Sequence, residues 1–222
     1  MALPHITSEL VLTVLEACAV IASAIAGMIV ASHKGMDLVG AYALACLNAF
    51  GGGTVRDLML DNRPFYWMAH WPYLVAIAAI CVPFVYNASM YRMTHEVHRR
   101  SVKVDALGLA LFTITGSGIA LEHDAPLVVA LLMGVLTGTA GGMLRDVVVN
   151  EIPDLFRPGG LYATAALAGA AVFVAGLEQA MAYTPAAALG VATIILLRLL
   201  SLRLGVSIPA PHWVDPEERV EH

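Results

Sequence analysis

The sequence predicts an all-α integral membrane protein with seven transmembrane helices, six of which form two inverted three-helix repeats, followed by a seventh helix. Composition, apolar segments and an internal repeat support this prediction. Of the 222 residues, 59% are hydrophobic and only 13% are charged, and the mean hydropathy is +0.77. A water-soluble domain does not accommodate such a composition, so the chain is expected to lie in a membrane.

Seven apolar segments are long enough for membrane-spanning helices, which need about 20 mostly apolar residues. Prolines near the start of several segments support the boundaries, because the first turn of a helix does not use their missing backbone N–H. The predicted spans are residues 10–32, 37–60, 73–90, 103–121, 126–149, 160–177 and 184–202.

Two short segments of the chain are nearly identical and define the internal repeat. The sequence GGGTVRD at 51–57 recurs as AGGMLRD at 140–146, so that Arg145 lies 89 positions after Arg56. A constant offset over a long stretch is the signature of a duplicated structural unit. The same offset joins Glu16 to Asp105, Gly27 to Gly116, Pro64 to Pro153 and Tyr73 to Tyr162.

The repeat length predicts that the two halves are inverted. An offset of 89 residues contains three predicted spans, an odd number, so the second half enters the membrane from the opposite side. A pseudo-two-fold axis in the membrane plane follows. We predict a first repeat at 1–90, a second at 91–179, a seventh transmembrane helix at 180–205 and a cytoplasmic tail at 206–222.

The distribution of lysine and arginine predicts the orientation in the cell inner (plasma) membrane. By the positive-inside rule, the side with most basic residues is cytoplasmic, which places the N-terminus outside and the C-terminus in the cytoplasm. The basic residues predicted on the cytoplasmic side are Lys34, Arg92, Arg99, Arg100, Lys103, Arg157, Arg198, Arg203 and Arg219.

Consecutive glycines in the second and fifth spans are candidate kinks. Each glycine in a helix interior costs about 1 kcal/mol relative to alanine, so Gly51, Gly52 and Gly53 predict a kink or local unwinding, as do Gly141 and Gly142. Freed backbone groups are tolerated in a membrane only against packed protein or a water-filled route. The alternative interpretation is close packing of helices through small residues.

The repeated charges have both functional and architectural interpretations. Arg56 and Asp57 are about 100° apart on a helix, and we therefore expect them not to face each other. The symmetric hypothesis pairs Arg56 with Asp146 and Arg145 with Asp57. Such pairs either lie beside a transport route or only hold the fold together.

Glu16 and Asp105 are a further matched pair, which we expect near the starts of the first and fourth spans. The helix dipole favours acidic groups there, and the functional alternative is a cation-attracting vestibule at each end. Five aromatic residues predict an anchoring belt at the outer membrane interface: Phe65, Tyr66, Trp67, Trp71 and Tyr73.

Cofactor and enzyme signals are weak. Cys18, Cys46 and Cys81 have no metal-site spacing and are expected to be small core residues. His95 and His98 lie three residues apart in a polar connection, where metal binding is a minor alternative. Because no nucleotide-binding motif or nucleophile elbow is present, we predict a non-enzyme without a cofactor, metal site or nucleic-acid partner.

The doubled glycine–arginine–aspartate pattern, the stretch DALGLALFTITG at 105–116 and the surroundings of Pro153 and Arg157 together resemble the prokaryotic branch of the trimeric intracellular cation (TRIC) channels. The resemblance covers about residues 8 to 203, nearly the whole chain. It departs at Ala140, which stands where the first copy has Gly51, so the second motif has one glycine fewer.

The resemblance implies a homotrimer in membrane lipids, with one pore in each protomer. It implies passage of potassium ions, with sodium ions less favoured, along the second and fifth helices. It assigns the five motif glycines to the kinks and places Arg56, Asp57, Arg145 and Asp146 beside the route.

Two other functional classes remain open at the level of sequence. Inverted repeats with broken helices are also typical of secondary transporters, and relatives with this motif have been linked to uptake of small amino acids such as glycine. A non-conducting membrane scaffold is the third class. Unitary currents, saturable uptake or neither would distinguish the three.

Overall fold

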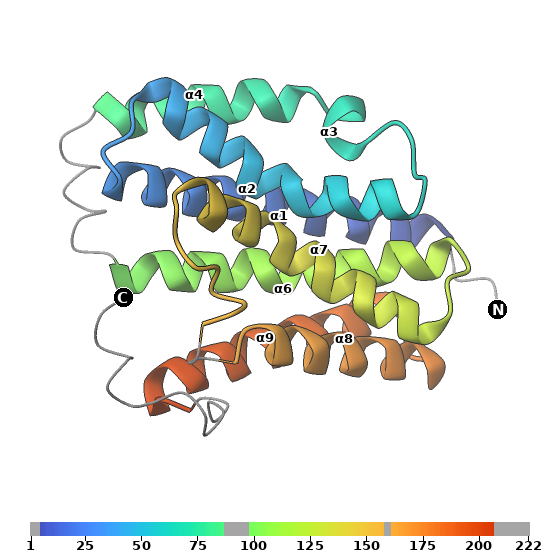
Figure 1. Cartoon of the computed structure of the whole chain (residues 1–222). Coiled ribbons are helices and arrows are strands. Elements are labelled where there is room, and N and C mark those ends of the chain that lie inside the picture. The colour runs from blue at the N-terminus through green and yellow to red at the C-terminus, as the bar shows by residue number, and fades with distance from the viewer. Residues whose placement is uncertain (1–4, 87–97, 158–160, 207–222) are drawn as a thin grey trace.

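The computed structural model describes residues 5–86, 98–157 and 161–206, without the side chains of 5–9 and 98–103. Eight α-helices and no strands occupy these ranges (Figure 1). The helices are α1 (His5–His33), α2 (Leu38–Met59), α3 (Tyr66–Ala69), α4 (Pro72–Tyr86), α6 (His98–Glu122), α7 (Leu127–Val148), α8 (Ala163–Glu178) and α9 (Tyr183–Leu204).

The all-helical prediction is confirmed, and each of the seven predicted apolar segments contains one helix. Five helices, α1, α2, α6, α7 and α9, are long and apolar enough to cross a membrane. The apolar helices α4 and α8 are shorter, with 15 and 16 residues. The sequence did not predict α3, because a helix of four residues has no apolar periodicity.

Local signals explain several helix ends. The Asp37 side chain accepts a hydrogen bond of 2.8 Å from the Gly40 N–H and so caps the start of α2. Pro72 is the first residue of α4, and Pro126 directly precedes α7. Gly205 ends α9 in the left-handed conformation at φ 64°, which favours glycine.

The helices run lengthwise between two ends of the bundle (Figure 1). We call the end that holds the start of α1 and the end of α2 the N-side. The opposite end, with the end of α7 and the end of α9, is the C-side. Helix α1 runs from the N-side to the C-side, whereas its repeat counterpart α6 runs the opposite way. The two repeats are therefore inverted, as predicted.

Reciprocal contacts between α2 and α7 locate the pseudo-two-fold axis. A Cβ atom at Gly52 would overlap the carbonyl oxygen of Thr137, and one at Gly141 would overlap the carbonyl oxygen of Asn48. Positions 48 and 137 differ by the repeat offset, as do 52 and 141. Because each repeat presents the same site to the other, the axis passes between the two helices at this crossing.

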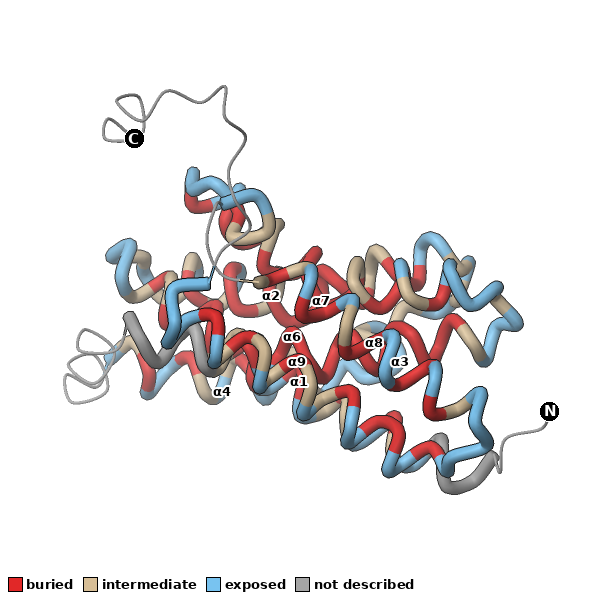
Figure 2. Tube along the Cα trace, turned by 90° about the horizontal axis from the view of Figure 1, so that it is seen from below, coloured by how far each residue is buried: buried red, intermediate tan, exposed pale blue. Residues whose placement is uncertain are grey.

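Helix α6 lies at the centre of the bundle, where it packs against α1, α7, α8 and α9. Every residue from 108 to 120 is buried, and Figure 2 shows the buried residues concentrated along the middle of the bundle. Small side chains allow this close approach: a Cβ atom at Gly134 would overlap the Ser117 hydroxyl, and one at Gly138 the Thr113 hydroxyl.

Helices α2 and α7 stay helical through their glycine motifs, so the expectation of local unwinding is wrong at both. Helix α2 nevertheless changes direction along its length (Figure 1). The close approach of the two helices at Gly52 and Gly141 explains why side chains are missing there, as the packing interpretation expects.

Candidate functional site

The N-side triad consists of Glu16 on α1 with Arg56 and Asp57 on α2. The Arg56 guanidinium lies 2.7 Å from Glu16 Oε1 through Nη1 and 2.7 Å from Asp57 Oδ1 through Nη2, and its Nε also donates to Asp57. The Arg56 side chain is only 1% exposed. One buried cation thus holds two buried carboxylates, which is the arrangement that a buried charge requires.

The C-side triad repeats this geometry with Asp105 on α6 and Arg145 and Asp146 on α7. The Arg145 guanidinium lies 2.9 Å from Asp105 Oδ1 and 2.8 Å from Asp146 Oδ1. The second carboxylate oxygen of Asp105 is buried and has no hydrogen-bond partner among the described residues. The repeat offset therefore preserves a three-residue charge network at each end of the bundle.

The hypothesis that paired Arg56 with Asp146 and Arg145 with Asp57 is wrong. Each arginine binds the aspartate that follows it, although we expected such neighbours not to face each other. The expectation considered only the direction in which each side chain leaves the helix. An arginine side chain is long enough to bend across the 100° between adjacent positions and present its fork of donors.

The expected dipole role of Glu16 and Asp105 is also wrong. Helix α1 begins at His5 and α6 at His98, so Glu16 lies about three turns into its helix and Asp105 about two turns. The effect of a helix dipole is confined to the first turn. The arginine of the same repeat is what stabilises each carboxylate.

The five motif glycines divide into two groups. Gly51, Gly52 and Gly141 lie at the crossing of α2 and α7, where an added Cβ atom would meet atoms of the other helix. Gly53 and Gly142 instead lie beside the arginines: an added Cβ atom would be 3.8 Å from Arg56 Nη2 and 3.7 Å from Arg145 Nη2, respectively. Only the second group lies next to the charge triads.

The chain that follows each triad helix turns back and caps the aspartate. The backbone N–H of Tyr66 donates to Asp57 Oδ2 over 3.0 Å. On the C-side, the backbone N–H of Asp154 donates to Asp146 Oδ2 over 3.2 Å. Each loop thus donates a backbone hydrogen bond to the aspartate of its triad, although the two donors differ by one position in the repeat alignment.

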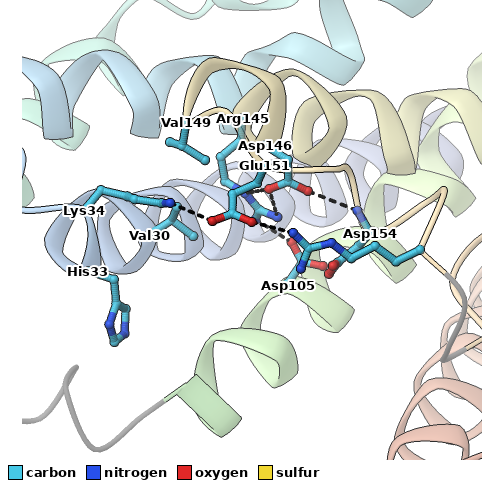
Figure 3. A pocket seen from close by; sticks show the side chains of 10 residues that line it. Val30, His33, Lys34, Asp105, Arg145, Asp146, Val149, Glu151 and Asp154 are labelled. Atoms are coloured by element: carbon cyan, nitrogen blue, oxygen red, sulfur yellow. Dashed lines mark hydrogen bonds and ion pairs between the residues drawn. The ribbon is translucent and has the colours of Figure 1, made fainter. Parts of the chain in front are cut away.

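The C-side triad lies on the wall of a cavity of about 310 Å³ (Figure 3). Lys34, from the turn after α1, reaches across to Glu151, from the loop after α7, at 2.6 Å. Arg157 binds the other oxygen of Glu151, also at 2.6 Å. This exposed bridge connects the two repeats. The other lining residues are Val30, His33, Asp105, Arg145, Asp146, Val149 and Asp154.

The N-side triad has almost no free space beside it. The cavity there measures about 10 Å³, which is about the room that one water molecule needs. Its lining includes two members of the triad, Glu16 and Arg56, and four aromatic side chains, Phe50, Tyr66, Trp67 and Phe112. Water thus has room beside Arg145 and hardly any beside Arg56.

The loop after α7 lies outside the predicted spans, and two of its carboxyl groups, Glu151 and Asp154, have pKa values shifted in opposite directions. Hydrogen bonds from Lys34 and Arg157 hold the pKa of Glu151 below its ordinary value. Burial raises the pKa of Asp154, and repulsion from Asp105 and Asp146 raises it further. Burial and like charge thus weaken the acidity of Asp154, whereas its two cationic neighbours strengthen that of Glu151.

The sequence did not single out Glu151 and Asp154; Lys34 served only to predict orientation, and Arg157 served for orientation and for the family resemblance. The repeat alignment distinguishes these loop residues, because three charged residues of the second repeat align with uncharged residues of the first. Glu151 aligns with Asn62, Asp154 with Phe65 and Arg157 with Met68. His95 lies outside the described residues, as does the side chain of His98. Among the residues that the structure describes, no group of three or more His, Cys, Asp or Glu could hold a metal ion.

An inverted-repeat helical bundle with buried charges near both ends is typical of membrane transport proteins. The family model described as "Glycine transporter" matches residues 13–88 and 102–178, so that its two matches begin one repeat offset apart. The chain is 35% identical to a UPF0126 membrane protein of Vibrio cholerae over 84% of this chain and 77% of that one. The inner membrane protein YadS of Escherichia coli K12 is 33% identical, with 84% and 89% covered.

Solved structures share this fold. A TRIC trimeric intracellular cation channel orthologue from Rhodobacter sphaeroides has a TM-score of 0.80 and 35% identity, over 88% of this chain and 99% of that one. A prokaryotic TRIC channel in 0.5 M KCl has a TM-score of 0.81 and 26% identity, over 90% and 100%. The chain belongs to the UPF0126 membrane protein family, the prokaryotic TRIC-like proteins.

Proposed function

We propose that the protein is a cation channel of the inner membrane that conducts potassium ions in preference to sodium ions. The observation that supports this most is the likeness to solved TRIC cation channels, which reaches 35% identity over 88% of the chain. The charge triads support it further, because ionisable residues inside a membrane bundle mark ion routes.

The proposed route runs along the charged faces of α2 and α7, past Gly53 and Arg56 toward the N-side and past Gly142 and Arg145 toward the C-side. Gly53 leaves space next to Arg56, and Gly142 brings α7 close to the Tyr162 hydroxyl, which an added Cβ atom would meet at 3.1 Å. Asp105 and Asp154 give the C-side cavity carboxylate oxygens that attract cations. The proposed role of Gly51, Gly52 and Gly141 is to hold the two kinked, pore-lining helices together.

We extend the proposal to assembly and orientation. The channel is a homotrimer in membrane lipids with one pore in each protomer, the N-side faces outward and the C-side faces the cytoplasm. Lys34, Arg157, Arg198 and Arg203 support this orientation by the positive-inside rule. The division into repeats at 1–90 and 91–179 is part of the same proposal.

Planar-bilayer recording of the purified protein in asymmetric potassium and sodium chloride tests the function. We expect unitary currents whose reversal potential follows the potassium gradient. Absence of unitary currents in protein that elutes as a single oligomer would contradict the proposal.

Uptake of radiolabelled glycine into proteoliposomes tests the alternative transport class. The family model carries the description "Glycine transporter", so saturable uptake that unlabelled glycine competes away is the specific alternative result. Uptake without unitary currents would replace the channel by a secondary transporter.

Asp105→Asn and Asp154→Asn, which keep the side-chain size, should lower potassium conductance if the route passes the C-side cavity.

A further inference from the structure

Short helix α3 and its flanking residues cover the N-side triad. The segment is tied to the triad by the Tyr66 N–H bond to Asp57, and the Asn62 amide adds a longer contact of 3.4 Å to the same carboxylate. The Tyr66 ring stacks on His70 at 4.3 Å between ring centres. Tyr66 and Trp67 pack against the hydrophobic cluster that contains Phe50.

The same segment has features of a part that moves. None of the four residues of α3 is fully buried, although two of them are aromatic. The hydrogen bonds that connect α3 and its flanking residues to the long helices go mainly to one carboxylate, that of Asp57. A segment held by few hydrogen bonds can separate from its neighbours without disturbing the packing of the long helices, so α3 can move while the bundle stays folded.

Four aromatic side chains line the N-side cavity, whereas no Phe, Tyr or Trp side chain of the described residues lines the C-side cavity. Phe50 and Phe112 line the small N-side cavity, and the repeat offset aligns them with Thr139 and Ser23. Trp67 aligns with Phe156, which is 65% exposed and does not line the C-side cavity. One end of the bundle is therefore sealed by aromatic rings and the other is not.

We propose that α3 is the N-side gate of the conduction route and that Trp67 is the side chain that closes it over Thr54 and the N-side triad. This inference rests on the proposed function, because a gate presupposes a route. With Trp67 in place, the space beside Arg56 is about 10 Å³, too little for a hydrated cation. Displacement of α3 would join the triad to the water on the N-side.

Thiol labelling measures this closure without measuring current. Cys18, Cys46 and Cys81 are first replaced by serine or alanine, and Thr54→Cys then reports on the N-side and Val30→Cys on the C-side. Thr54 and Val30 are both half-buried, and each lines the cavity at its own end. A membrane-impermeant maleimide is applied to intact cells and, separately, to inverted vesicles.

We expect Val30→Cys to react quickly from one side and Thr54→Cys to react slowly from either side. Adding Trp67→Ala should raise the Thr54→Cys rate at least tenfold, from the side opposite to the one that labels Val30→Cys. Trp67→Phe, which keeps an aromatic ring, should leave that rate low. The matched change Phe156→Ala should leave both rates unchanged.

Fast labelling of Thr54→Cys with Trp67 present would overturn the gate, as would an unchanged rate in both Trp67→Ala and the milder Trp67→Leu. Labelling of Val30→Cys from only one side reports in every variant that the bundle is still folded and inserted. If labelling behaves as expected but no unitary currents are found, the proposed channel fails while water access past α3 stands. If currents are found but the labelling pattern is absent, only the gate fails.

Discussion

The two charge triads of this molecule have the same internal geometry and different surroundings. Arg56 and Arg145 each bind a carboxylate on the preceding helix of the repeat and the aspartate next in sequence. Aromatic rings leave about 10 Å³ beside the first, whereas the second lines a cavity of about 310 Å³. Duplication thus preserved the charge network, and sequence divergence in the flanking loop and neighbouring helices changed its access to water.

Removal of the two arginines should have the largest effect and should differ between the ends. Arg56→Ala leaves Glu16 and Asp57 buried without a cation, which costs about 3–5 kcal/mol for a buried pair. Arg145→Ala leaves its carboxylates beside a cavity that admits water, so we expect a smaller loss. Thermal unfolding followed by fluorescence-detected size exclusion measures both.

Lysine variants are the controls for the two arginine-to-alanine substitutions. Arg56→Lys and Arg145→Lys keep the charge and lose the fork that binds two carboxylates, so each should fall between its alanine variant and the parent. Equal losses for the two alanine variants would contradict the difference in water access.

Substitution within a single glycine motif should give the next largest effect. Gly52→Ala places a methyl group on the Thr137 carbonyl, and overpacking of this kind costs about 1–3 kcal/mol. Gly53→Ala finds nothing nearer than 3.8 Å and should be tolerated. The apparent melting temperatures of the two variants measure this difference in stability. Similar values would contradict the close crossing of α2 and α7.

A smaller, pH-dependent effect on conductance should be stronger at the C-side than at the N-side. The pKa of Asp154 is raised by burial and by Asp105 and Asp146, and lowered in part by Arg198 and Arg145. As the C-side pH falls through this raised pKa, above the ordinary value of 3.8, Asp154 loses its charge and potassium conductance should decline. Bilayer recording with one compartment acidified measures the decline.

The matched variant for this experiment is Asp154→Asn. It should conduct less at neutral pH and lose the dependence on acidification from the C-side. Phe65, which aligns with Asp154, has no ionisable group, so acidifying the N-side compartment should have the weaker effect. A dependence that survives in Asp154→Asn would assign the titration to another group.

Much of the fold could be predicted because hydropathy and duplication are properties of long segments. The constant offset between the motifs was sufficient to predict the inversion that α1 and α6 display. The four-residue helix α3 could not be found this way, since it owes its position to the bond between the Tyr66 N–H and Asp57 rather than to its own periodicity.

The candidate site was predicted only in part. The sequence singled out Glu16, Arg56 and Asp57 as members of matched pairs, but a helical-wheel argument assigned them the wrong partners because it ignored the length of an arginine side chain. All three belong to one repeat and recur together at the same offset, and this pattern alone would have grouped them. The large C-side cavity depends on the packing of two loops and could not be predicted from spacing.

Hydrogen–deuterium exchange of two matched segments most directly tests the claim that the two ends differ in water access. In nanodiscs, the segment 60–68 beside the N-side triad should exchange more slowly than the segment 149–157 beside the C-side triad. Each segment contains one amide that is hydrogen-bonded to its triad aspartate, that of Tyr66 and that of Asp154. Equal exchange of the two segments, or faster exchange at 60–68, would contradict the account.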